Sequence, residues 1–179
     1  MGLHGSNTCE LTLDQVPVPE TSRLGEEGEG FLIAKSALDG GRIGIAAQAL
    51  GIAQAALDLA RERIAPPGGF GGWRSSLKPS FVRLAELTAR TEAARLLVYR
   101  AAVMRQEGAP CTKEASMAKL YASDTAVAVS SETIALLGEE GGMKTCIAER
   151  LFRDAKVTQI YEGTNEIHRI VIGNRLLYP

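Results

Sequence analysis

The sequence FLIAKSALDGGRIGIAAQALGIAQAALDLARERI, residues 31–64, decides the fold. Its apolar side chains return every three to five residues, which is the spacing of one face of an α-helix. These positions are Phe31, Ala34, Leu38, Ile43, Ala47, Leu50, Ala53, Leu57 and Ala60. The pattern predicts one long helix from about residue 31 to residue 64. The prolines and glycines of 66–72 end it, because proline cannot occupy a helix interior.

Four glycines lie inside this helix, Gly40, Gly41, Gly44 and Gly51. Each costs the helix roughly 0.5–1 kcal/mol relative to alanine. We therefore expect another backbone or a ligand to approach the helix closely at these glycines.

Further helices follow along the chain. The second runs over about 79–107, and the third begins with Thr112 as a plausible cap and ends near Gly138. A short helix covers about 146–155, and an amphipathic helix covers 165–177. The sequence thus predicts an all-α fold, an antiparallel bundle of four to five helices joined by short loops.

Two expectations complete this fold. Leu11 and Leu13 alternate with polar residues, which predicts a short edge strand within residues 9–18, in front of the bundle. The helical faces predict a core that contains Leu38, Ile43, Leu50, Leu57, Leu84, Leu87, Leu96, Val127, Ile134 and Ile170.

Composition argues against several classes of partner. The 179 residues carry 20 Lys and Arg against 21 Asp and Glu, so no basic excess is available to bind nucleic acid. Apolar stretches such as 43–53 are interrupted by Gly and Gln, which predicts no membrane span. The first residues lack the basic and apolar regions of a secretory signal. Three widely spaced cysteines and two histidines favour neither a disulfide framework nor a zinc site.

Common catalytic and metal motifs are missing from the sequence. A di-iron bundle needs Glu-x-x-His on two helices, whereas Asn165 stands three residues before His168, so we expect no metal site. The glycine-rich loop 66–72 has no phosphate-binding pattern. Ser130-Ser131 lacks the GxSxG elbow, so acyl transfer by a nucleophilic serine has no support.

The informative segment is Tyr161-Glu-Gly-Thr-Asn-Glu166. Its first carboxylate precedes a glycine, on a turn whose backbone a flat ligand can approach, and Thr164 or Asn165 is available to cap the next helix. Taken alone, this pattern more often describes a solvated glutamate beside a helix cap.

Two longer segments carry a family resemblance. RDAKVTQIYEGTNEIHR, residues 153–169, and LDGGRIGIAAQALGIAQ, residues 38–54, together resemble the C-terminal helical domain of acyl-CoA dehydrogenases, the short-chain (butyryl-CoA) type in particular. The resemblance runs from Met1 to about Leu177. It implies that residues 1–27 are the end of a β-domain and a linker, and that residues 28–179 are the helical bundle domain.

The resemblance also implies a reaction. Glu162 would be the base that removes the α-proton of a short acyl-CoA while the β-hydride passes to FAD. In the isovaleryl and long-chain branches the base stands instead at the position of Gly41. Substrate contacts would come from Asp39, Gly40, Gly41, Arg42 and Gly163. Without the resemblance, residues 39–42 describe a helix with a glycine packing notch and a surface ion pair.

The expected flavin contacts are only partly kept. Thr164, Asn165 and Glu166 match the family pattern, although Asn165 stands where Ser is frequent. Pro67, Lys78, Ala135 and Glu139 depart from it, and Glu139 places a negative charge where the FAD diphosphate would lie. These losses concentrate on one ligand while the catalytic turn is kept.

Three functions remain open at this point. The chain is the catalytic-domain portion of an acyl-CoA dehydrogenase completed by flavin-binding domains, or a flavin-free helical partner or truncated or engineered homologue, or an acyl-CoA-binding module without redox chemistry. Expected partners are acyl-CoA, a second copy or a full-length flavin-binding chain, and electron-transfer flavoprotein. The resemblance places the protein in the cytoplasm of a bacterium or the mitochondrial matrix of a eukaryote.

Overall fold

The computed structural model describes residues 1–65 and 79–178, and all regular structure in these ranges is helical, which confirms the all-α prediction. The α-helices are α1 (Gly30–Ile64), α3 (Pro79–Gln106), α4 (Thr112–Leu137), α5 (Ile147–Thr158) and α6 (Asn165–Leu177). Short 3-10 helices cover Glu20–Ser22 and Gly138–Gly142. The glycine-rich loop 66–72 and the positions Pro67 and Lys78 lie outside the described residues.

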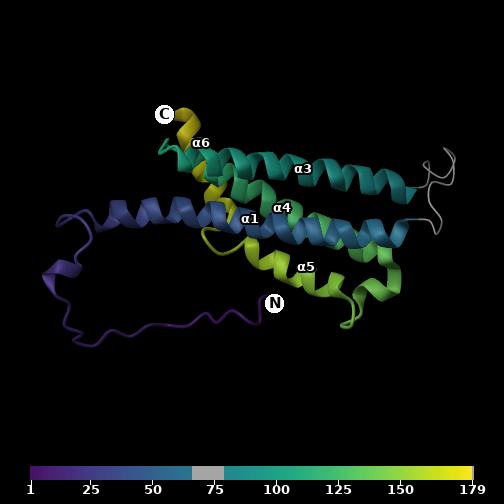
Figure 1. The fold of residues 1–179 in the computed structure, drawn as a ribbon, viewed down its shortest axis with the longest axis horizontal. Helices are drawn as coiled ribbons and strands as arrows, with labels where there is room; N and C mark the ends of the chain where they lie inside the picture. The colour runs from purple at the N-terminus through teal and green to yellow at the C-terminus, as the bar shows by residue number, and fades with distance from the viewer. Residues whose placement is uncertain (66–78, 179) are drawn as a thin grey trace.

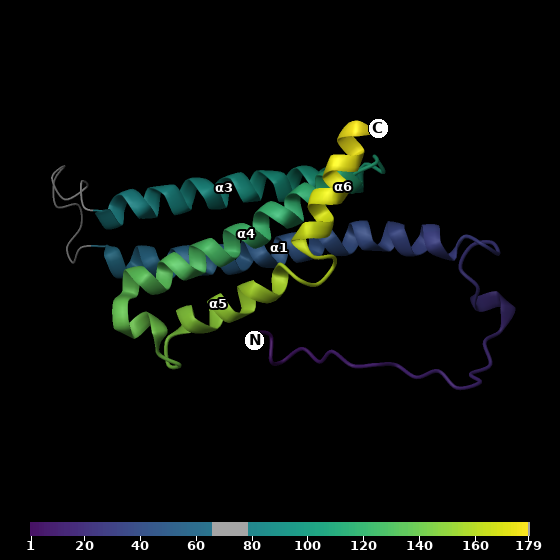
Figure 2. The same ribbon diagram turned by 180° about the vertical axis from the view of Figure 1, so that it is seen from behind.

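The helices form a bundle in which α1, α3 and α4 lie side by side, α5 packs along α4 and α1, and α6 packs across one end of α4 (Figures 1 and 2). Successive long helices run antiparallel, as predicted. The most extensive contact, however, joins α1 to α4, which run in the same direction. Near their starts Thr112 bonds Asp39, and near their ends Thr133 bonds the main chain of Ala56.

Small side chains allow α1 and α4 to pack closely. Each helix has a stripe of completely buried alanines spaced three or four residues apart, namely Ala46, Ala49, Ala53, Ala56 and Ala60 on α1, and Ala115, Ala118, Ala122 and Ala126 on α4. The distance between helix axes depends on the side chains at their contact, so alanine permits a short one. The Thr133 hydroxyl therefore reaches the carbonyl oxygen of Ala56, at 3.1 Å.

The apolar composition of α1 exceeds the sequence expectation. An 18-residue window of this helix has a mean hydropathy of 1.5, so by length and composition alone the helix could cross a membrane. The expectation that every apolar stretch is too short or too polar for a membrane span is therefore wrong for α1. Core helices of soluble proteins pass the same test, and 39% of this window is buried inside the bundle. The buried alanine stripe accounts for part of this composition.

The predicted edge strand is wrong. Residues 7–14 have no regular structure, and Leu11 and Leu13 are 85% and 81% exposed. A strand needs a neighbour to pair its main-chain groups, and the described residues supply none here. The first residues dock on α5 instead, where the amide of Leu3 donates to Asp154 Oδ1 at 2.6 Å.

The predicted core is correct in part. Leu50, Leu57 and Leu87 are buried, and Ile43, Leu84, Val127 and Ile134 are half-buried. The prediction is wrong for Leu38, Leu96 and Ile170, which are 43%, 69% and 57% exposed. Periodicity identifies an apolar face, but it does not show whether another helix of the same chain covers that face.

Three local expectations also fail. Thr112 is the first residue of α4 rather than its cap. Its hydroxyl donates to Asp39 of α1, at 2.6 Å, instead of to a group at the helix start. The short helix predicted to end near residue 155 continues to Thr158. A Cβ at Gly44 or Gly51 would meet no other atom of the described residues within 4 Å, so no backbone of this part of the chain approaches these two glycines closely.

We predict that Ala53→Leu destabilises the protein, whereas Ala55→Leu on the exposed side of the same helix does not. Ala53 is completely buried in the core, and overpacking such a site costs about 1–3 kcal/mol. Urea unfolding measures both free energies. Equal values for the two variants would show that the stripe is not tightly packed.

Candidate functional site

The turn between α5 and α6 has an unusual backbone. Glu162 has a φ angle of 54° and Gly163 one of 95°, so two consecutive residues occupy the left-handed region. Glycine adopts this conformation readily, but a residue with a side chain is strained there, and such strain persists where the surrounding structure holds it. The amide of Asn165 closes the turn by donating to the Gln159 carbonyl at 3.2 Å.

The Glu162 side chain lies against Gly41 of α1. A Cβ built on Gly41 would lie 2.7 Å from Glu162 Cδ and 3.1 Å from Oε1. Only a glycine leaves room for the carboxylate in its present position. The Tyr161 hydroxyl donates to Gln48 Oε1, which ties the turn to the same helix. Folding thus brings the two segments that carry the predicted substrate and base residues together.

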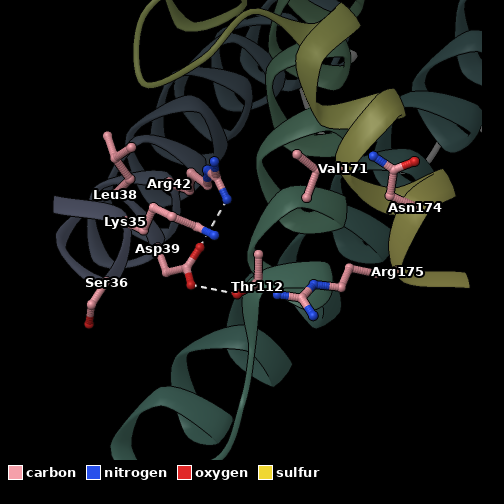
Figure 3. A pocket seen from close by; sticks show the side chains of 9 residues that line it. All are labelled: Lys35, Ser36, Leu38, Asp39, Arg42, Thr112, Val171, Asn174 and Arg175. Atoms are coloured by element: carbon pink, nitrogen blue, oxygen red, sulfur yellow. Dashed lines mark hydrogen bonds and ion pairs between the residues drawn. The ribbon is translucent and has the colours of Figure 1, made fainter. Parts of the chain in front are cut away.

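A polar network flanks this contact on α1 and α4. Arg42 Nη1 donates to Asp39 Oδ1 at 2.9 Å, and the Thr112 hydroxyl donates to Asp39 Oδ2 at 2.6 Å (Figure 3). The side chains of Asp39 and Arg42 are only 14% and 12% exposed. The pair is therefore a partly buried link between α1 and α4 rather than a solvated surface ion pair.

A pocket of about 280 Å³ opens beside this network. Figure 3 shows that side chains from α1 and from the last turns of α6 face it across the start of α4. Its lining residues are Lys35, Ser36, Leu38, Asp39, Arg42, Thr112, Val171, Asn174 and Arg175. Three of them are basic and one is acidic, so the pocket suits an anionic group.

Beneath the turn lies Lys119 of α4, whose side chain is completely buried. Its Nζ donates to the Gly163 carbonyl at 2.6 Å and to Asn165 Oδ1 at 3.0 Å. Desolvation lowers the pKa of Lys119 to about 8, although the nearby charges of Asp124, Glu166 and Glu162 oppose this shift.

His168 of α6 lies directly under Gly163. The ring is completely buried, and within the described residues neither of its nitrogens has a partner with hydrogen-bond geometry. Burial, together with the charges of Lys119 and Arg42, lowers the pKa of His168 to about 4, although backbone groups of the turn offset part of this shift. A Cβ at Gly163 would lie 3.3 Å from this ring, which is a second reason for glycine at that position.

Sequence reasoning missed the residues that support the turn, namely Gln48, Lys119, Ser123 and His168. A weak signal existed for Lys119, which stands four residues after Ala115 and four before Ser123, on the small-residue face of its helix. Its burial and its partners depend on the docking of α6, which no spacing predicts.

The predicted flavin contacts differ in their availability. Thr164 and Glu166 are exposed, whereas Asn165 is buried and its amide is bonded to Lys119, Ser123 and Asp124. Ala135 and Glu139, which depart from the family pattern, are exposed. In the described ranges no three His, Cys, Asp or Glu side chains gather closely enough to hold a metal ion.

Comparison with known proteins identifies the family of this chain. The family model described as "Acyl-CoA dehydrogenase, C-terminal domain" matches residues 28–177. The chain belongs to the acyl-CoA dehydrogenase family. This acyl-CoA dehydrogenase domain is 52% identical over 181 residues to an acyl-CoA dehydrogenase of Bacillus subtilis, covering 99% of the chain but 47% of that protein. The chain therefore spans less than half the length of the curated relatives it matches.

Solved structures agree with the family assignment. Butyryl-CoA dehydrogenase from Megasphaera elsdenii matches the domain with a TM-score of 0.82 and 49% identity, over 89% of this chain and 42% of that one. A chain from a structure on the electron-transferring flavoprotein of Acidaminococcus fermentans matches with a TM-score of 0.82 and 46% identity, over 90% and 43%. The acyl-CoA dehydrogenase relatives thus share both the bundle and its sequence.

We predict that His168 makes the protein sensitive to mild acid. Its pKa is about 4 in the folded state against 6.5 for a free histidine, so between these values the unfolded state binds more protons and stability falls as pH falls. From pH 7 to pH 5 the wild type should lose about 1–2 kcal/mol more than His168→Leu. His4→Gln, at an exposed histidine, should keep the wild-type dependence. Urea unfolding at both pH values tests this, and equal losses in wild type and His168→Leu would contradict it.

Proposed function

We propose that this chain is the base-carrying domain of a short-chain acyl-CoA dehydrogenase. The observation that carries the proposal is the Glu162 carboxylate seated against Gly41, where α1 leaves no side chain in its way. Its similarity to short-chain enzymes supports the substrate class, since the Megasphaera elsdenii structure is a butyryl-CoA dehydrogenase. Residues 1–27 would then be the end of a preceding domain, and residues 28–179 the helical domain.

Glu162 would take the α-proton of the acyl-CoA thioester. A carboxylate removes a proton from so weak an acid only if it is held at the reacting carbon and shielded from water. The strained turn holds the Glu162 backbone, and Gly41 gives its side chain room. Asp39, Gly40, Arg42 and Gly163 border the same place and would position the thioester. FAD, when bound, would accept the β-hydride.

The described residues fit one part of a flavin site. Thr164 caps α6 and Glu166 lies in its first turn, and both are exposed beside the turn that carries Glu162, where they could face a ring system. Two other positions of the expected flavin site do not fit, because Ala135 offers no side-chain donor and the exposed Glu139 would repel the diphosphate. The buried Asn165 supports the turn rather than offering its amide to a ligand. A complete flavin site would therefore draw its diphosphate contacts from other domains or another chain.

The exposed Glu139 also favours a second candidate function, a flavin-free helical subunit that assembles with a flavin-binding chain. Leu96, Tyr99 and Val103 of α3 are between 51% and 69% exposed, and such apolar side chains suit an interface with a second copy or a partner. Electron-transfer flavoprotein remains the proposed electron acceptor of the complete enzyme. The visible absorbance spectrum of the complete protein, purified with any further domains of its own polypeptide and without a partner chain, separates the two functions, since only the flavoenzyme is then yellow.

We predict that Glu162→Gln lowers the turnover rate of butyryl-CoA by about 10²–10⁴-fold or more, and that folding and acyl-CoA binding stay nearly unchanged. The amide keeps the shape of the side chain but cannot accept a proton. Glu166→Gln, at an exposed residue of the next helical turn, is the matched control and should have a much smaller effect. Stopped-flow flavin reduction, or a product assay if a partner chain carries the flavin, measures both. A Glu162→Gln variant with near wild-type rate would remove the assignment.

We predict that Gly41→Ala lowers activity by at least about tenfold while leaving the protein folded. The new methyl group would occupy the place of the Glu162 carboxylate, which can swing away because it ends a flexible side chain. Gly44→Ala is the control on the same helix, where a Cβ meets nothing within 4 Å. Thermal unfolding and the same rate assay decide the outcome, and equal rates for the two variants would contradict the proposed seat of the base.

A further inference from the structure

Lys119 is the largest completely buried side chain of the described residues. Burying an ammonium group is costly, and such a group normally has a carboxylate partner. Within the described ranges Lys119 has no carboxylate oxygen within 4.0 Å, and its two hydrogen bonds go to the Gly163 carbonyl and to Asn165 Oδ1. Both hydrogen bonds of this buried ammonium group are made where the turn between α5 and α6 leads into α6.

The turn needs such support. Glu162 and Gly163 are both left-handed, which directs the Gly163 carbonyl toward α4 and away from the hydrogen bonds of either neighbouring helix. Hydrogen bonds to an ionised donor are about twice as strong as those between neutral groups. At 2.6 Å, the bond from Lys119 to this carbonyl is short, as expected for an ionised donor.

The same lysine also reaches the far end of the turn. Asn165 begins α6, and its Oδ1 accepts from Lys119 at 3.0 Å and from the Ser123 hydroxyl at 3.1 Å. Its amide nitrogen donates to Asp124 Oδ1 at 2.8 Å. Lys119 therefore binds one group on each side of Thr164 and joins both to α4.

We propose that Lys119 is a positioning residue, which holds the strained Glu162–Gly163 turn in the conformation that seats the Glu162 carboxylate against Gly41. Its effect passes through the Gly163 carbonyl and the Asn165 side chain. The conformational part of this inference stands on the contacts alone. Its consequence for catalysis rests on the proposed function of Glu162.

The backbone amide of Asn165 reports on the turn directly, because its hydrogen bond to the Gln159 carbonyl closes it. In Lys119→Met, which keeps the buried chain but no donor, hydrogen exchange of this amide, followed by NMR, should be at least about tenfold faster than in the wild type. Thr133→Val is the matched control. Thr133 lies at the far end of the same helix, and the substitution removes a completely buried hydroxyl that is hydrogen-bonded to α1. It should leave the Asn165 amide unchanged.

Wild-type exchange in Lys119→Met, or equal acceleration in Thr133→Val, would overturn the proposal. If Lys119→Met does not fold, Lys119→Gln, which keeps only a shorter neutral donor, takes the same measurement with the same expectation.

A kinetic measurement separates this proposal from the function of Glu162. In the complete flavin-loaded enzyme, Lys119→Met should lower kcat about 10- to 100-fold with KM for butyryl-CoA nearly unchanged, because a displaced base loses reactivity rather than substrate affinity. Faster exchange together with lowered kcat supports both proposals. Faster exchange with unchanged kcat supports the positioning of the turn and counts against Glu162 as the base. Unchanged exchange overturns the role of Lys119 whatever the rate.

Discussion

The close packing of α1 on α4 is the contact on which the rest of the structure depends. Completely buried alanines line both helices, and a threonine hydroxyl of α4 reaches the main chain of α1. Because the two helices run in the same direction, the start of α4 lies beside Asp39 of α1 and its end lies beside the later turns of α1. The chain segment 39–42 is thereby fixed over the face of α4 on which α6 docks. Without this contact, Gly41 and the Glu162 carboxylate would not be held at a fixed distance from each other.

The turn that carries Glu162 depends on a second layer of interactions below it. Lys119 and Asn165 bond the turn from α4 and α6, while Tyr161 reaches Gln48 on α1. A strained backbone persists only where its surroundings hold it. Three helices thus hold one short segment, and the segment presents one carboxylate. Supporting this turn explains why polar residues are deeply buried in a domain whose most extensive helix contact is made by alanines.

The arrangement also explains what this domain lacks. Glu162 and its surroundings are assembled within the chain, whereas two of the positions expected to contact FAD carry Ala135 and the exposed Glu139. The chain spans less than half of its curated relatives, so the complementary surfaces belong to other parts of such proteins. Under the proposed function, the base would be held inside the bundle and the cofactor would be bound across its borders.

The sequence by itself determined the helices and the family. Apolar spacing located α1 and α3 to within about one residue, because helical periodicity is a local property. The motifs at 38–54 and 153–169 identified the family and its candidate base. Spacing did not show which apolar faces stay open, so Leu38, Leu96 and Ile170 were misplaced. It also suggested a strand where residues 1–65 and 79–178 supply no neighbour to pair with it.

Only the tertiary structure decided how Glu162 is held. The seat of its carboxylate against Gly41 and the buried ammonium of Lys119 arise where α1, α4 and α6 meet. The His168 ring, which has no hydrogen-bond partner in the described part of the chain, lies there too. A sequence records residue types and spacings along one chain direction. Burial, desolvation and the shortage of hydrogen-bond partners are properties of groups brought together from distant positions, so they exist only once the helices have packed.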